Sequence, residues 1–227
     1  MIINWGDAPF KAFITVTYPG GTCTVTGEGQ TYTHTGGGTK TFTVKKKGTY
    51  TVKATDGSLT ASTSSSISKR GQAATATLSY SLVLLPNSSY STIWGNTNGS
   101  SNSSYASSSV TSSTMTVRVG DKTYARVQTK TKYTLPAGAK VSFKVSSFTN
   151  AAYGYSPTSH FYISTASPTS TSGFSVSKSI SATGTFSFNV DTRGDYYIGL
   201  LNTIGKVTDY STTEYITTAI NSVTITK

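Results

Sequence analysis

Residues that could act as general bases, nucleophiles or metal ligands are scarce in this chain. The 227 residues include 2 histidines, His34 and His160, and 1 cysteine, Cys23. Zinc sites and cysteine–histidine pairs need such groups at close spacing or in one cleft, and the sequence offers neither arrangement. His34 lies beside the glycines of residues 36–38, which predicts a hairpin turn, and His160 begins an aromatic strand. We therefore expect no metal site and no catalytic residue.

Paired carboxylates are the remaining route to chemistry, because two carboxylates facing one cleft can hydrolyse a glycoside. The chain has 8 acidic residues, and Asp191 and Asp195 form the closest such pair. They flank Gly194, so turn formation explains them more simply than catalysis, and a calcium site at this turn is a further alternative. We expect a protein that is not an enzyme and that carries no cofactor.

Aromatic side chains are the best candidates for recognition. Their flat rings stack on the apolar faces of sugars, while neighbouring hydroxyl and amide groups supply hydrogen bonds. The alternative for each ring is that it belongs to the core or anchors a loop. The predicted glycan-stacking platform, with His160 beside it, consists of Trp94, Tyr105, Tyr153, Tyr155 and Tyr162.

The first ten residues precede any clear periodicity and contain Trp5 and Phe10. We interpret residues 1–10 as an N-terminal arm, with Trp5 and Phe10 as attachment residues. The alternative is a leading edge strand.

The formal charge of +11 indicates an anionic partner. The alternative explanation is that the charge keeps the protein soluble. The densest basic run, Lys45–Lys47, falls where we expect a hairpin turn, and no motif for specific nucleic-acid binding accompanies it. One cysteine excludes an internal disulfide. The sequence predicts no membrane span and no signal peptide, so we expect folding in a cytoplasm.

Strand-like alternation with frequent turn signals predicts an all-β chain of two β-sandwich modules. The first module is expected over residues 11–81 and the second over residues 82–227, which include a Ser- and Asn-rich loop at 86–114 that is packed and partly strand. The expected strands are residues 12–18, 23–26, 39–45, 48–55, 58–68, 72–85, 115–119, 124–129, 140–147, 160–165, 174–181, 185–190, 195–201 and 219–227.

One motif occurs in both modules. The segment from Phe42 to Val52 matches the segment from Phe188 to Ile198 as aromatic, x, Val, three polar residues, Gly, x, Tyr, x, then Val or Ile. A tyrosine at such a corner can bury its ring and return its hydroxyl to the corner backbone. We therefore predict that Tyr50 and Tyr196 are core corner residues.

The first module resembles a known family in its strand and turn positions. The residues concerned are Ile14–Val25, Phe42–Val44, Gly48–Gly57 and Gly71–Tyr80. They resemble the small immunoglobulin-like modules, similar to PEGA and carboxypeptidase-regulatory domains, that recur in bacteriophage and prophage virion proteins. The second module is similar, more loosely, to jelly-roll, carbohydrate-binding-type sandwiches. The segments that carry this second resemblance are Tyr133–Gly138, Asp195–Ile198 and Ile220–Ile225.

The resemblance implies a phage virion protein assembled in the host cytoplasm. We expect a non-enzymatic structural or accessory subunit of the capsid-decoration or head-fibre type, forming a homo-oligomer and contacting other virion proteins. The alternative is a tail-associated receptor-binding protein that recognises host surface glycans. Specific nucleic-acid binding is not expected in either case.

Overall fold

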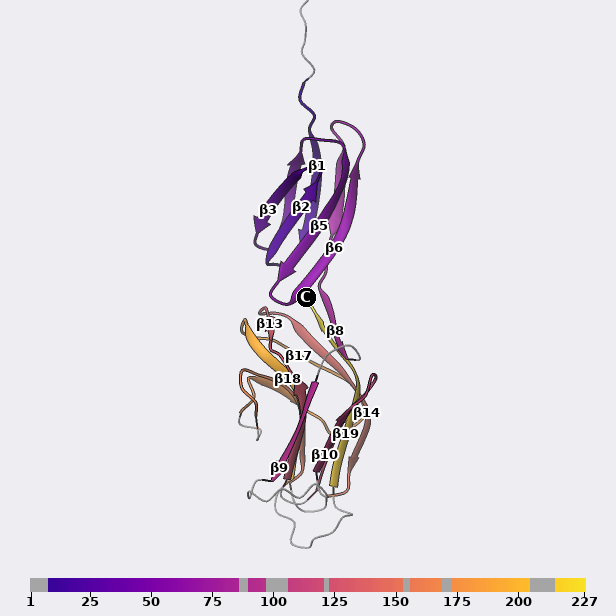
Figure 1. Ribbon diagram of the computed structural model, residues 1–227, viewed down its shortest axis with the longest axis vertical. Coiled ribbons are helices and arrows are strands. Elements are labelled where there is room, and N and C mark those ends of the chain that lie inside the picture. Colours follow the sequence, from indigo (N-terminus) through magenta and orange to yellow (C-terminus); the bar gives the residue numbers. More distant parts are fainter. Residues whose placement is uncertain are drawn as a thin grey trace, which may run out of the picture. The chain divides into compact units, whose positions relative to one another are not determined.

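The computed structural model is an all-β protein that divides into two compact units (Figure 1). Unit 1 comprises residues 1–81 together with residue 227, and unit 2 comprises residues 82–226. The described part of the chain contains no α-helix, and it therefore contains no helix that could span a membrane. The structure describes residues 8–85, 90–96, 106–120, 123–152, 156–168, 173–204 and 215–227, with residues 91–96 and 123 described for their backbone alone.

Unit 1 is a sandwich of a three-stranded sheet, ordered β4-β1-β7, and a four-stranded sheet, ordered β3-β2-β5-β6. A strand of alternating apolar and polar residues buries one face and exposes the other, because successive side chains of a strand point to opposite faces. In β1 every second residue from Ala12 to Tyr18 is buried, and the residues between them face outwards. The strands are β1 (Ala12–Tyr18), β2 (Thr22–Gly27), β3 (Gln30–Thr35), β4 (Gly38–Val44), β5 (Gly48–Asp56), β6 (Leu59–Ile67) and β7 (Ala73–Thr77).

Unit 2 is a second sandwich of two six-stranded sheets. One has the order β10-β11-β19-β14-β17, with β8 also paired to β19, and the other has the order β16-β15-β18-β12-β9, with β13 also paired to β18. The strands are β8 (Ser81–Leu85), β9 (Tyr90–Asn96), β10 (Ala106–Val110), β11 (Met115–Gly120), β12 (Thr123–Thr129), β13 (Tyr133–Leu135), β14 (Lys140–Asn150), β15 (Thr158–Ser164), β16 (Val176–Ser179), β17 (Gly184–Asn189), β18 (Gly194–Thr203) and β19 (Tyr215–Thr226).

Two kinds of contact join the sheets of unit 2. Phe143 on β14 stacks on Phe161 on β15, with ring centroids 4.4 Å apart. Asn202 on β18 is fully buried and donates from Nδ2 to the carbonyl of Val117 on β11 at 2.9 Å. The aromatic contact supplies apolar burial. The amide contact gives the buried Nδ2 donor of Asn202 a partner on the other sheet.

Both predicted tyrosine corners are confirmed. Tyr50, which is 0% exposed, donates its hydroxyl to the carbonyl of Lys46 at 2.9 Å. Tyr196, 5% exposed, donates to the carbonyl of Thr192 at 2.7 Å. The same four-residue return therefore occurs once in each unit. Burial raises the pKa of the Tyr50 hydroxyl.

The last residue of the chain belongs to unit 1. Lys227 exchanges two backbone hydrogen bonds with Tyr80, at 2.8 and 3.2 Å. Its ammonium group lies 3.0 Å from a carboxylate oxygen of Asp56, which is 4% exposed at the end of β5. The chain thus leaves unit 1 beside Tyr80 and returns beside the same residue, so two segments of chain connect the units.

Lys227→Ala is expected to lower the free energy of unfolding of unit 1 by about 1 to 3 kcal/mol, because it leaves the buried Asp56 carboxylate without its ammonium partner. Chemical denaturation measures this loss. Lys53→Ala, at an exposed position of β5, is the matched control and should change stability by about 0.5 kcal/mol or less. Equal stability of the Lys227→Ala and Lys53→Ala variants would contradict the prediction.

Several sequence-based expectations need correction. Residues 30–35 form β3, so His34 lies in a strand and not in a hairpin turn. Residues 72–85 form two strands, and these belong to different units. Lys45–Lys47 do form a connection, but it passes from one sheet of unit 1 to the other and is not a hairpin. The residues of β3 are mostly polar, so the sequence does not distinguish this strand from a turn. A short connection between two sheets likewise resembles a hairpin turn in the sequence.

Candidate functional site

Most side chains of the predicted glycan platform lie outside the described part of the structure. Tyr105, Tyr153 and Tyr155 lie outside the described residues, and so does Trp5 of the predicted arm. Trp94 lies in β9, which pairs with β12, but its side chain is not described. The stacking role of these residues therefore stays a prediction.

Tyr162 is the one member of the platform whose ring is described, and it lies in the protein interior. It is 0% exposed and its ring stacks on Phe174, with centroids 4.8 Å apart. The hydroxyl donates to Oε1 of Gln128 at 3.1 Å. Of the two alternatives that the sequence left open, this geometry corresponds to the core residue, because Phe174 of the same chain occupies a stacking face that a sugar would need.

The strand pairing explains why an outward-facing ring is covered. Tyr162 lies opposite Gly199, which lies opposite Gln128, so these three residues share one face of the β16-β15-β18-β12-β9 sheet. Neighbouring Phe161 points the other way, into the sandwich, where it meets Phe143. A side chain on Gly199 would place its Cβ 2.8 Å from the Tyr162 hydroxyl. The tyrosine therefore lies over the glycine.

A segment that follows β15 covers this face. Arg126 on β12 donates to the carbonyl of Pro168, and Gln128 donates to Oγ of Ser167 at 2.8 Å. Both side chains are buried, although they alternate with the core residues Ala125 and Val127. In the sequence, this alternation is typical of a strand with one solvent-facing side, so Arg126 and Gln128 were missed as interior residues.

His160 lies two residues before Tyr162 on the same face of β15 and is half-buried. Its ring lies 5.4 Å from that of Phe174, and burial lowers the pKa of the imidazole. Nδ1 lies 3.5 Å from the hydroxyl of Ser179. These contacts describe a histidine packed at the margin of a covered sheet.

The remaining candidates for chemistry are His34, Cys23, Asp191 and Asp195. His34 Nδ1 and the hydroxyl of Tyr18 are hydrogen-bonded at 2.6 Å. Cys23 is buried, and burial raises the pKa of its thiol. Asp195 accepts a hydrogen bond from Thr134, and Asp191 is exposed. Within the described residues, no group of three or more His, Cys, Asp or Glu side chains could hold a metal ion.

The feature of unit 1 that stands out is a cluster of positive charge at one end, which we call the basic end. The start of β1, the β4–β5 connection and the β6–β7 connection meet there, because Ala12 pairs with Val44, Phe13 with Ala73, and Gly48 with Ile67. All cations of the basic end are exposed, namely Lys11, Lys45, Lys46, Lys47, Lys69 and Arg70.

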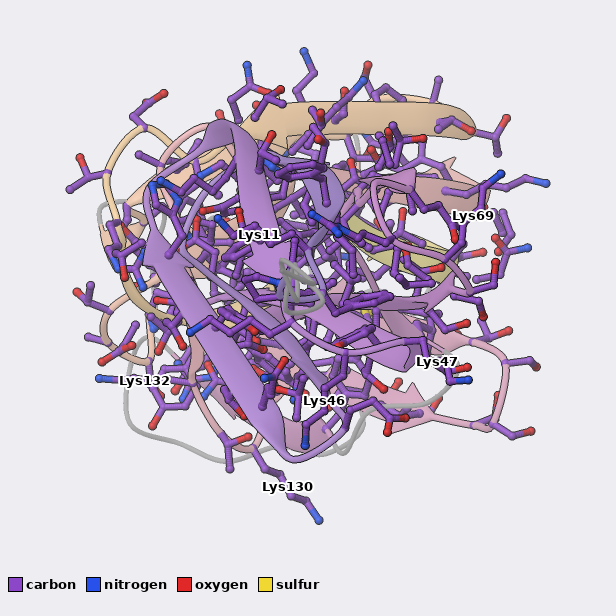
Figure 2. The ribbon with its side chains drawn as sticks, turned by 90° about the horizontal axis from the view of Figure 1, so that it is seen from above. Lys11, Lys46, Lys47, Lys69, Lys130 and Lys132 are labelled. Carbon is purple, nitrogen blue, oxygen red and sulfur yellow. The ribbon has the colours of Figure 1, made fainter. Side chains whose placement is uncertain are left out.

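Figure 2 shows unit 1 from the end at which β1 begins. The labelled lysines of unit 1, which are Lys11, Lys46, Lys47 and Lys69, lie around this end. Among the described residues of unit 1, the carboxylates are Glu28 and Asp56. Glu28 lies in the β2–β3 turn near the basic end, where its backbone carbonyl accepts a hydrogen bond from Lys46 Nζ at 3.1 Å. Asp56 is buried beside Lys227. The positive charge of the basic end is therefore largely uncompensated within the described part of unit 1.

An apolar pocket adjoins the basic end. It has a volume of about 350 Å³ and is lined by Pro9, Phe10, Lys11, Thr43 and Lys45. Phe10, the predicted attachment residue, is half-buried in its wall. This combination of an apolar floor and two ammonium groups could hold an apolar side chain beside carboxylates.

Comparisons with known proteins do not assign the chain to a family. No family model and no curated protein matches it. The chain is similar to a solved carbohydrate-binding module of the β-sandwich superfamily, with 15% identity and a TM-score of 0.38 over 96% of this chain and 97% of that one. It is also similar to a Bacteroides vulgatus protein assigned as a candidate pore-forming toxin, with 12% identity and a TM-score of 0.19 over 97% of this chain and 92% of that one. These distant likenesses carry no functional argument, and the all-β sandwich fold is assigned from the strands and sheets themselves.

Proposed function

We propose that this protein is a non-enzymatic structural subunit of a phage particle, of the capsid-decoration or head-fibre type. Unit 1 attaches to the particle and unit 2 is the part that is presented. The support for the virion setting is the resemblance of unit 1 to immunoglobulin-like virion modules. Assembly takes place in the host cytoplasm, and the subunit forms a homo-oligomer.

The observation that carries this proposal is the double connection between the units. Tyr80 and Lys227 are neighbours in unit 1, and all of unit 2 lies between them in the chain. A unit inserted in this way depends at both its ends on the unit that holds it. We infer that unit 2 is a displayed domain held at both ends by its support.

The location and copy number of the protein in purified particles test the proposal. Quantitative mass spectrometry and antibody labelling in the electron microscope should find it at symmetry-related positions over the whole shell. Deletion of residues 1–10 should reduce its binding to empty capsids, because these residues contain Trp5 and the pocket residue Phe10. Absence from the particle would overturn the proposal, and release of reducing sugars by the pure protein would overturn its non-enzymatic part.

Recognition of a host glycan predicts different results. The protein would occur in a few copies at one vertex and would bind members of a glycan array. Binding of this kind should be lost in Trp94→Ala or Tyr155→Ala, two of the four platform residues whose side chains are not described. That outcome would replace decoration with tail-associated receptor recognition as the function of unit 2.

A further inference from the structure

We propose that the basic end of unit 1 docks on an acidic protein surface and that the neighbouring pocket receives an apolar side chain of this partner. The inference rests on the proposed function, since it specifies the surface through which unit 1 attaches. It names a partner chemistry, a segment rich in Asp and Glu with one apolar residue among them.

The clustering of charge is the first argument. The cations come from the segment just before β1 and from two separate connections, and the fold brings them to one end of the sandwich. Like charges held together repel one another, and a bound anionic partner removes this cost. Charges needed for solubility alone could be spread over the faces of the sandwich, as the exposed Lys40 on β4 and Lys53 on β5 are. The start of β1 lies at the basic end, whereas Tyr80, where the chain leaves for unit 2, donates its hydroxyl to the carbonyl of Gly20 beyond the other end of β1.

Exposed apolar surface beside the cations is the second argument. Phe13 is 38% exposed and lies next to Thr43, which lines the pocket. Phe10 and Pro9 continue this apolar surface towards Lys11. Protein interfaces combine an apolar anchor seated in a pocket with a charged rim, and the geometry here supplies both parts.

The same features favour a protein over a nucleic acid. Nucleic acids held without sequence preference stack their bases on exposed aromatic faces along a basic groove. The pocket that adjoins the described part of the basic end is small, with a volume of about 350 Å³. Such a pocket can hold one side chain but cannot follow a strand of bases. A nucleic acid bound as tightly as an acidic peptide would therefore contradict the proposal.

Peptide binding to the full-length protein tests the proposal. The probe is a short Glu-rich peptide with one central Phe, and the comparison peptide has Ser at that position. Fluorescence anisotropy should show about tenfold tighter binding of the Phe peptide, weakened by added salt. Phe10→Ser should remove this preference and leave the salt dependence unchanged. Equal binding of the two peptides to the unaltered protein would overturn the pocket's role.

A matched pair of charge variants tests the basic end itself. The double variant Lys46→Glu with Lys47→Glu should weaken the Phe peptide by about tenfold or more. The control, Lys40→Glu with Lys53→Glu, makes the same change in net charge within unit 1 and should weaken binding by about twofold or less. Equal losses in the two variants, or equally tight binding of a single-stranded oligonucleotide of the same charge, would overturn the proposal. Thermal unfolding should show that both variants are folded.

The particle separates failure of this inference from failure of the proposed function. If Lys46→Glu with Lys47→Glu loses peptide binding and its place on the particle, both stand. If it loses peptide binding but keeps its full copy number, attachment uses another surface, and this inference fails while the proposed function holds. If peptide binding behaves as expected but the unaltered protein is absent from particles, the proposed function fails and the acidic partner lies elsewhere.

Discussion

Tyr50→Ala is expected to lower the free energy of unfolding of unit 1 by about 3 to 5 kcal/mol. The ring is fully buried at the start of β5, and its removal leaves a cavity that the surrounding strands cannot close. Tyr50→Phe keeps the ring and loses the hydrogen bond to Lys46, so it should cost about 1 kcal/mol. Urea denaturation followed by circular dichroism measures both losses.

The repeated motif supplies an internal check on this prediction. Tyr196 makes the same return bond in unit 2, so its Ala and Phe variants should show losses in the same order. Tyr32→Ala is the comparison in unit 1, because this half-buried tyrosine on β3 donates its hydroxyl to Gln30 and does not make the return bond to Lys46. A loss for Tyr50→Ala no larger than that for Tyr32→Ala would show that the corner does not support the unit.

Tyr162→Ala should destabilise unit 2 by a similar amount, about 3 to 5 kcal/mol. The substitution removes a fully buried ring, its stacking on Phe174 and its bond to Gln128. It also uncovers Gly199, which has no side chain to fill the space left by the tyrosine ring. Hydrogen exchange of β15 and β18 locates the loss within the sheet.

This measurement separates a core residue from a residue of an open binding platform. A ring kept for sugar stacking can be removed at little cost to stability, whereas a core ring cannot. Tyr197→Ala is the control on β18, since this half-buried ring lies under the ammonium group of Lys132 at 5.3 Å and should contribute less. Unchanged stability of Tyr162→Ala would return Tyr162 to the predicted platform.

The sequence predicted the local parts of the structure well. The strand around Ala12–Tyr18 and both tyrosine corners follow from alternation, turn residues and burial, which act over a few neighbours. β3 was missed because its Thr, Tyr and His residues are mostly exposed and carry no apolar alternation. The segment 72–85 was merged into one strand because its apolar character continues where the chain passes between units.

In the candidate sites, too, the sequence predicted local features and missed contacts between distant residues. The sequence predicted that Tyr162 lies in a strand. Its covering by Phe174, and the burial of Arg126 by Pro168, depend on a segment that folds back over the sheet. Such contacts involve residues far apart along the chain, and a single sequence contains no signal for them.

The sequence by itself determined that the chain is all-β, that Tyr50 and Tyr196 close equivalent corners, and that its charge is strongly positive. Only the tertiary structure decided where the charge acts. Lys45–Lys47 are adjacent in sequence, but Lys11, Lys69 and Arg70 join them because parallel and antiparallel pairing brings distant strand ends together. Residue type sets which interactions are possible, and strand pairing sets which of them share one surface.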